Sequence, residues 1–156
     1  MLELNHIKKV YNPGLVTEMC IFDDFNLQVK DKEFVSIVGS NGSGKTSLLN
    51  IICGSIPADG GDILVNGQRI NSLDEYKRYR RIGRVYQNPA LGTCPNMTMM
   101  ENLSLADNKG KRFGLSRGTN YKRKAFYQEQ LAALGLGLEN KLDVKLGSLS
   151  GGQRQA

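Results

Sequence analysis

Eight consecutive residues, GSNGSGKT at positions 39–46, have the composition and spacing of a phosphate-binding loop. Glycines let a backbone wrap a phosphate chain with its N–H groups pointing inward, and a helix that follows adds its positive N-terminal end. In such a loop Lys45 would place its charge on the β- and γ-phosphates, and the Thr46 hydroxyl can bind Mg²⁺. The sequence therefore predicts a nucleoside triphosphate site. Its expected residues are Gly39, Ser40, Asn41, Gly42, Ser43, Gly44, Lys45, Thr46 and Ser47.

A phosphate loop of this kind lies between a buried strand and a helix. Residues 34–38 (FVSIV) are short and nearly all apolar, which predicts a strand covered on both faces in a parallel sheet. Residues 48–53 (LLNIIC) are apolar almost all round, which predicts a buried helix that ends at Gly54. The flanking sequence thus supplies both elements that the loop needs.

The remaining pattern divides the chain near Asn88. Before it, residues 2–4 and 25–29 alternate apolar and polar side chains, as half-buried strands do, and residues 62–67 and 82–87 are further predicted strands. We expect a β-rich nucleotide-binding part over 1–88 and a helical part over 89–156.

Two helices are predicted in the second part. Thr98 and Glu101 have the spacing of a capping box, which indicates a helix carrying Met99 and Met100. Residues 124–136 (KAFYQEQLAALGL) are predicted as a second helix.

The formal net charge of +6 comes from one stretch, residues 108–128, which contains seven basic residues and no Asp or Glu. A solvated loop and helix face would explain it. The functional alternatives are contact with anionic lipid headgroups, with an acidic partner or with nucleic acid. No RNA- or DNA-binding motif accompanies the stretch, so we rank nucleic acid lowest and expect no nucleic-acid partner. The seven residues are Lys109, Lys111, Arg112, Arg117, Lys122, Arg123 and Lys124.

Size and composition exclude several classes of protein. A chain of 156 residues is long enough for one domain with a sizeable core. No apolar run approaches the ~20 residues that span a bilayer, and the first residues lack the apolar core of an export signal. Cys20, Cys53 and Cys94 are odd in number and widely spaced, which fits neither a disulfide framework nor a metal site. We expect a protein of the reducing cytoplasm.

Together with the phosphate loop, Tyr11, Gln87 and LSGGQ at 149–153 resemble the ATP-binding cassette ATPases, the motor subunits of ABC transporters. LSGGQ is the most specific of these features, because other phosphate-loop NTPases lack it. The resemblance runs from the first predicted strand to the last residue. It implies an α/β fold: a RecA-like P-loop NTPase core with an N-terminal antiparallel β subdomain and a helical subdomain.

The resemblance also implies roles for single residues. Tyr11 would stack on adenine, although an ordinary turn tyrosine would explain it too. Gln87 would reach the Mg²⁺ and the attacking water, so Gln87 and Lys45 are the expected catalytic residues, and Thr46 and Gln87 the expected magnesium ligands. A second group would cap a helix N-terminus that contacts the γ-phosphate held by another subunit, in a head-to-tail dimer. These residues are Ser150, Gly151, Gly152 and Gln153.

The cofactors implied in this way are ATP and Mg²⁺. The implied partners are a second ATPase subunit and transmembrane permease subunits, which would hold the protein on the inner face of the cell membrane. Residues 88–115 are similar to a subgroup of bacterial ATPases that work with a substrate-binding protein to import a small organic solute. The alternatives are a soluble ABC-type ATPase of translation or DNA repair, and a nucleotide-binding module without hydrolysis.

The sequence departs from the family pattern after the LSGGQ segment. Family members continue with an apolar strand that ends in a magnesium-binding Asp, then a catalytic Glu and later a His. No such segment occurs in these 156 residues, and the only histidine, His6, lies in the first predicted strand. We therefore expect a fragment, incomplete at its C-terminus, that binds ATP and hydrolyses it poorly or not at all.

Overall fold

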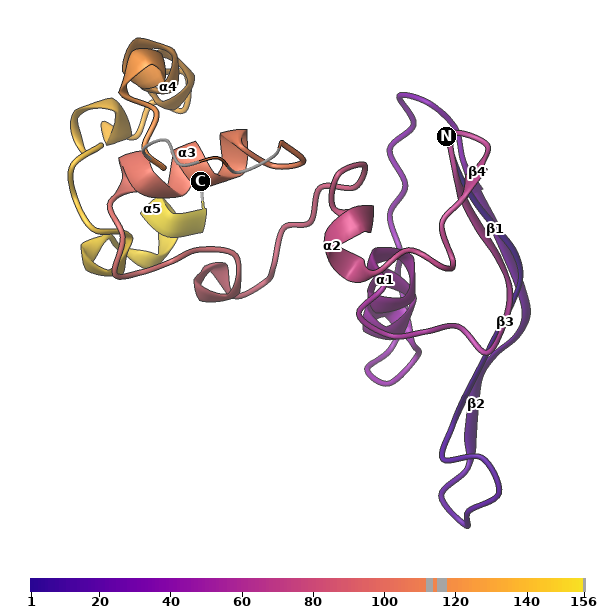
Figure 1. Cartoon of the computed structure of the whole chain (residues 1–156). Coiled ribbons are helices and arrows are strands. Elements are labelled where there is room, and N and C mark those ends of the chain that lie inside the picture. The colour runs from indigo at the N-terminus through magenta and orange to yellow at the C-terminus, as the bar shows by residue number, and fades with distance from the viewer. Residues whose placement is uncertain (112–113, 115–117, 156) are drawn as a thin grey trace. The chain divides into compact units, whose positions relative to one another are not determined.

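The computed structural model describes residues 1–111, 114 and 118–155 (Figure 1). The chain forms two compact units, Met1–Gly83 and Arg84–Ala156, and each is a separate body. The division predicted after residue 88 stays a prediction. None of the helices in the described part has the length and apolar composition that crossing a bilayer requires.

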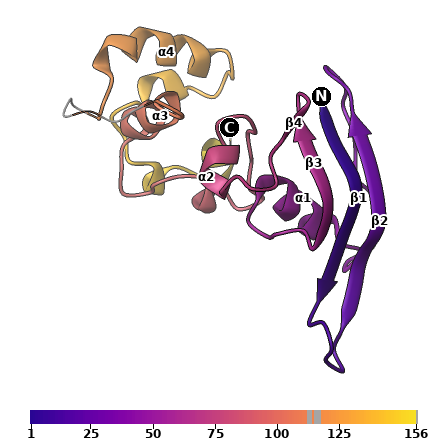
Figure 2. The ribbon, with the colours of Figure 1, turned by 45° about the vertical axis from the view of Figure 1, so that its right-hand side comes forward.

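The first unit is built on an antiparallel sheet with the strand order β2-β1-β3-β4, and Figure 2 shows its long strands side by side. The strands predicted at 2–4, 25–29 and 62–67 are confirmed, the last of them as far as Val65. The chain then turns at Asn66 and Gly67, whose φ angles are 50° and 73°. The four strands are β1 (Leu2–Tyr11), β2 (Met19–Val29), β3 (Gly60–Val65) and β4 (Gln68–Arg69).

Helix α1 (Lys45–Cys53) follows the phosphate loop, as predicted. It ends at Gly54, whose φ of 90° is a left-handed conformation that favours glycine. The short helix α2 (Glu75–Arg78) contacts the end of α1 through Arg78. The apolar side of α1 packs against the sheet in one core. Burial of each such large apolar side chain contributes roughly 1.5–3 kcal/mol. The core residues are Leu4, Ile7, Phe22, Leu48, Ile51, Ile52, Ile63 and Ile70.

Two of the predicted strands are wrong. Residues 34–38 and 82–87 are irregular in the structure. Strand β2 is the edge of the sheet, and no strand among the described residues pairs with residues 34–38. Phe34 and Val38 are 94% and 90% exposed. An apolar run becomes a buried parallel strand only when neighbouring strands cover it, and the run itself does not provide them.

The second unit is helical. The capping box is confirmed, because the Glu101 N–H donates to the Thr98 hydroxyl at 3.2 Å and the Thr98 N–H donates to the Glu101 carboxylate at 2.7 Å. The second predicted helix ends at Ala132 instead of residue 136. Beyond it Gly135 and Gly137 have positive φ angles of 67° and 66°, which a helix does not accept. The helices are α3 (Met99–Asp107), α4 (Lys124–Ala132) and α5 (Gly151–Gln155), with short 3₁₀ turns at Pro89–Leu91, Tyr121–Arg123, Leu138–Asn140 and Leu146–Ser148.

The segment that precedes α5 is fixed to the start of α3. The N–H groups of Met99 and Met100 donate to the carbonyls of Val144 and Leu142 at 3.0 and 2.8 Å. Below these bonds lies a second apolar core, which joins α3 and α4 to this segment. Its buried residues are Met99, Met100, Tyr127, Leu131, Leu138, Leu142, Leu146 and Leu149.

Candidate nucleotide site

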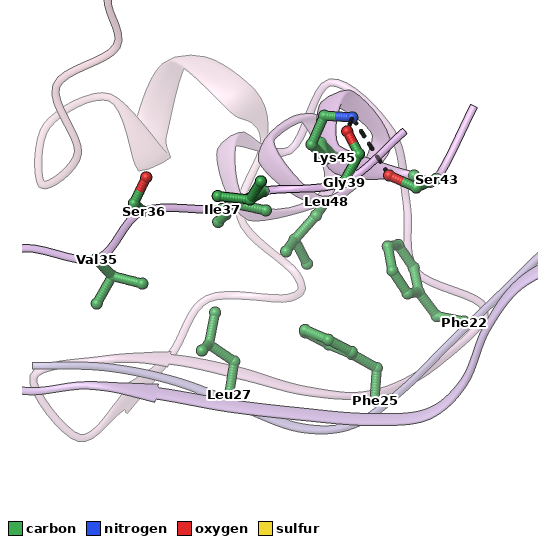
Figure 3. Close-up of a pocket in the computed structure, with 12 residues that line it drawn as sticks. Phe22, Phe25, Leu27, Val35, Ser36, Ile37, Gly39, Ser43, Lys45 and Leu48 are labelled. Atoms are coloured by element: carbon green, nitrogen blue, oxygen red, sulfur yellow. Dashed lines mark hydrogen bonds between the residues drawn. The ribbon is translucent and has the colours of Figure 1, made fainter. Parts of the chain in front are cut away.

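Lys45 ties the two ends of the phosphate loop together. Its ammonium group donates to the carbonyls of Gly39 at 2.7 Å and Ser40 at 2.6 Å, and to the Ser43 hydroxyl at 3.3 Å. Figure 3 shows the bonds to Gly39 and Ser43. Hydrogen bonds from a charged donor are among the stronger ones in proteins. The loop is therefore closed into a ring around the positive charge that the sequence predicts for phosphate.

Two glycines of the loop are required by the backbone. Gly42 and Gly44 have φ angles of 84° and 87°. A Cβ atom on Gly44 would also lie 2.7 Å from Cγ2 of Ile21 on β2, which is closer than real Cβ contacts. The loop thus turns sharply into α1 only because these side chains are absent.

The N-terminus of α1 is open to an anion. No side chain caps this helix, and its first turn contains no acidic residue. The first N–H groups of an α-helix have no partner within the helix, and its dipole places partial positive charge there. Thr46 is exposed in this turn. The loop closed by Lys45 and the first turn of α1 together form a cradle suited to phosphate.

Tyr11 belongs to the same site. Its hydroxyl lies 3.3 Å from the Ser47 hydroxyl on the first turn of α1. Its ring lies 5.4 Å from the ammonium group of Lys9, which is buried and pairs with Asp59 at 2.9 Å. The Val10 N–H and then Lys9 hold the pKa of the Asp59 carboxyl below its usual range. The structure therefore brings the predicted adenine-binding side chain to the phosphate loop.

Sequence patterns missed two supporting residues. Lys9 is buried at a position of β1 where the bulged register departs from strict alternation. Arg78 is buried on α2, and its guanidinium group donates to the carbonyls of Ile51 and Ile52, which end α1, at 2.9 and 3.2 Å. Both contacts join segments far apart in the sequence, so a local pattern contains no signal for them.

An apolar cavity of about 400 Å³ lies beneath the loop. Figure 3 shows Phe22, Phe25 and Leu27 of β2 facing residues 35–39 across it. Loop residues, Lys45 among them, line one end of the cavity, and the apolar remainder does not suit phosphate. The cavity lies between residues 35–39 and the sheet. It is present because residues 34–38 do not pair with a strand of the described sheet and so do not pack against it.

The other predicted site residues belong to the second unit. Gln87 is exposed and lines a hollow of about 590 Å³ together with Tyr86 and Asn88. Ser150 and Gln153 cap the start of α5 reciprocally, because the Gln153 N–H donates to the Ser150 hydroxyl at 3.3 Å and the Ser150 N–H to the Gln153 side chain at 3.4 Å.

The structure supplies one possible magnesium ligand at the loop, the exposed Thr46 hydroxyl. Over residues 1–111, 114 and 118–155 no group of three or more His, Cys, Asp or Glu side chains could hold a metal ion. Mg²⁺ commonly keeps several waters and takes one or two protein ligands plus phosphate oxygens, so a hydroxyl beside a phosphate cradle is compatible with it.

The chain is similar to proteins with related sites. A family model described as "ABC transporter" matches residues 22–156. A tyrosine transport ATP-binding protein of Clostridioides difficile (strain R20291) is 44% identical over the whole chain, which spans 62% of that relative. An oligosaccharides import ATP-binding protein of Bacillus subtilis (strain 168) is 38% identical over 99% of the chain and 38% of its own length. A dimeric ATP-binding cassette bound to ADP and Pi, in a post-hydrolysis state, has a TM-score of 0.76 and 31% identity, with 99% of this chain and 65% of that one covered.

Proposed function

The chain belongs to the ATP-binding cassette family of ABC transporters, and on that premise we propose that it is the ATP-binding part of a transporter's motor subunit. It spans less than two thirds of its similar relatives, so the activity of a whole protein is part of the proposal. The observation that carries the assignment is the closed loop at the open N-terminus of α1, where Lys45, two left-handed glycines and uncapped N–H groups meet.

In this proposal Lys45 and the first turn of α1 hold the phosphates, Thr46 adds a hydroxyl for Mg²⁺, and Tyr11 packs on the base. The Tyr11–Ser47 contact supports this arrangement, because it places the ring beside the loop. Mg²⁺ would neutralise charge on the phosphate oxygens when bound. We propose that Gln87 acts on the attacking water, as the resemblance to the family implies.

We further propose that Ser150–Gln153 contact ATP held by a second copy of the subunit. The dimeric state of the similar ADP-bound cassette supports this. Transmembrane permease subunits would then place the protein at the inner face of the cell membrane, and a substrate-binding protein would deliver the solute. The name of the tyrosine transport relative favours an amino acid as the small organic solute.

Hydrolysis by these 156 residues alone is expected to be poor. No apolar strand followed by Asp-Glu occurs in them, and His6 lies on β1 in contact with Asp24. Because phosphoryl transfer depends on groups that position water and neutralise charge, their absence from the chain removes most of the rate.

Binding of a fluorescent ATP analogue tests the site. We expect saturable binding by the chain and at least about a tenfold loss in Lys45→Ala, since a charged hydrogen-bond donor to a phosphate contributes about 1.5–3 kcal/mol. Lys30→Ala, which removes an equal charge from an exposed position of the same unit, is the matched control. Equal binding by Lys45→Ala and Lys30→Ala would overturn the assignment. Lys45-dependent release of phosphate at many turnovers would overturn the expectation of poor hydrolysis.

A further inference from the structure

The two units differ in net charge. Residues 1–83 contain ten basic and ten acidic residues, whereas residues 84–156 contain eleven basic and five acidic residues. The whole positive excess of the chain therefore lies in the second unit. A local excess of this kind attracts anionic surfaces over about one Debye length, roughly 10 Å at 0.1 M salt.

Asp107 gathers basic side chains from both ends of the basic stretch. Its carboxylate lies 2.7 Å from the Arg123 guanidinium and 3.8 Å from the Lys111 ammonium group. The Tyr127 hydroxyl donates to the same carboxylate at 3.1 Å. Because Asp107 ends α3 and Arg123 directly precedes α4, these contacts place the two ends of the stretch at one location.

The resulting basic surface consists of Lys109, Lys111, Lys122, Arg123 and Lys124. Two of its ion pairs in the described part of the chain are those of Asp107 and of Asp143, whose carboxylate lies 3.5 Å from Lys124. Lys109, Lys111 and Lys122 are exposed. Because residues 84–156 contain eleven basic and five acidic residues, the second unit stays positive whatever ion pairs it forms. Arg112 and Arg117 lie outside the described residues.

Aromatic side chains accompany these charges. Tyr121 and Phe126 are 59% and 43% exposed. Exposed aromatic rings among basic residues are typical of proteins that lie on the membrane interface. Single-stranded nucleic acid would instead stack its bases on open ring faces, and the Arg123 guanidinium covers one face of Phe126 at 4.2 Å from the ring centroid.

We propose that this basic surface binds the anionic headgroups of a lipid bilayer directly. The charge excess provides the attraction, and Tyr121 and Phe126 provide the part that enters the headgroup layer. The contact uses none of the residues of the nucleotide site, so it is independent of ATP binding.

Sedimentation of the full chain with lipid vesicles tests the proposal. We expect binding to phosphatidylglycerol vesicles, little binding to phosphatidylcholine vesicles, and loss of binding as salt is raised. The triple variant Lys109→Gln, Lys111→Gln, Lys122→Gln should bind on the order of a hundredfold more weakly, because each basic side chain near an anionic membrane contributes roughly fivefold.

A matched triple variant, Lys30→Gln, Lys32→Gln, Arg80→Gln, removes the same charge from exposed positions of the first unit and should bind vesicles like the unchanged chain. Equal losses in both triple variants, or equal binding to neutral vesicles, would overturn the proposal. Tighter binding to a single-stranded RNA oligonucleotide than to the anionic vesicles would also overturn it, in favour of a nucleic-acid surface. Lys45→Ala should leave vesicle binding unchanged, so a failed nucleotide site and a failed lipid surface are distinguishable.

Discussion

The phosphate loop (39–46) and the LSGGQ segment (149–153) both place glycines at the start of a helix, but only the loop needs them for its own fold. Gly44 has a φ of 87°, and an added Cβ would lie 2.7 Å from Ile21. Gly151 and Gly152 have no positive φ, and nothing lies within 4 Å of an added Cβ. The first glycine is thus explained inside the chain. The described residues give no such reason for the second pair, which agrees with the proposed contact to a second subunit.

The two helices also differ in how their ends are satisfied. Helix α1 is uncapped at its N-terminus and is held by Arg78 at its C-terminus. Helix α5 is capped by its own Ser150 and Gln153. The end of α1 therefore depends on a contact from a distant segment, whereas the start of α5 is capped by residues of the LSGGQ segment itself.

The largest expected effect comes from Arg78→Ala. It would remove four hydrogen bonds from the guanidinium group to backbone carbonyls, two of them on α1, and each buried acceptor left unpaired costs about 1–3 kcal/mol. Because the Ile51 carbonyl still accepts from the Gly54 N–H, we expect the free energy of unfolding to fall by about 2–6 kcal/mol. Urea unfolding followed by circular dichroism measures the change. Arg80→Ala, at an exposed position of the same segment, should stay within about 0.5 kcal/mol. A similar loss in both variants would show that the contact with α1 is unimportant.

Gly44→Ala is expected to cost slightly less. A left-handed backbone costs a non-glycine residue about 1–2 kcal/mol, and the contact with Ile21 adds about 1–3 kcal/mol of overpacking, so a loss of about 2–4 kcal/mol follows. Binding of the ATP analogue should fall with it. Full stability and full binding in this variant would contradict the conformation of the loop.

Gly152→Ala should raise the free energy of unfolding, where Gly44→Ala lowers it. Alanine is favoured over glycine within a helix by about 1 kcal/mol, and an added methyl group meets open space, so stability should rise by up to about 1 kcal/mol. Binding of the ATP analogue to the chain's own loop should not change. Destabilisation by this substitution would mean that glycine is needed here by the chain itself.

The smallest expected effect is a pH dependence that distinguishes the two capping boxes of the second unit, Thr98–Glu101 and Ser150–Gln153. Hydrogen bonds from the Thr98 N–H and then its hydroxyl lower the pKa of Glu101. A carboxyl whose pKa is lower in the folded protein than in the unfolded chain, where it is about 4.3, stabilises the fold at pH values above about 4.3. This stabilisation is lost as the pH falls through the folded pKa. Acidification should therefore weaken the cap of α3, whereas Gln153 does not titrate.

Urea midpoints of the unchanged chain and of Glu101→Gln, measured from about pH 6 down to about pH 3, check this expectation. The difference between the two proteins should shrink toward the acid end. A constant difference over this range would mean that the carboxylate is not the stabilising form.

Local signals predicted the elements whose conformation is decided locally. Gly54 ends α1 and Thr98 caps α3 as the sequence indicated, because a left-handed glycine and a capping box act within a few residues. The prediction for residues 34–38 was wrong because strand formation depends on distant partners. The burial of Lys9 and Arg78 was not predicted for the same reason. A charged side chain is buried only where the fold brings distant partners next to it, and a local sequence pattern does not indicate those partners.

The irregular segment 34–38 has a consequence for handling the protein. It combines exposed aromatic and β-branched side chains with no charge and no proline, a composition that promotes cross-β stacking between molecules. Purified material should accordingly show concentration-dependent turbidity that a charged residue at Val38 would delay. In a cell, chaperones and proteases act on exposed apolar stretches of this kind. The lifetime of the protein should therefore depend on whether residues 34–38, which directly precede the phosphate loop, are paired with another strand or left exposed.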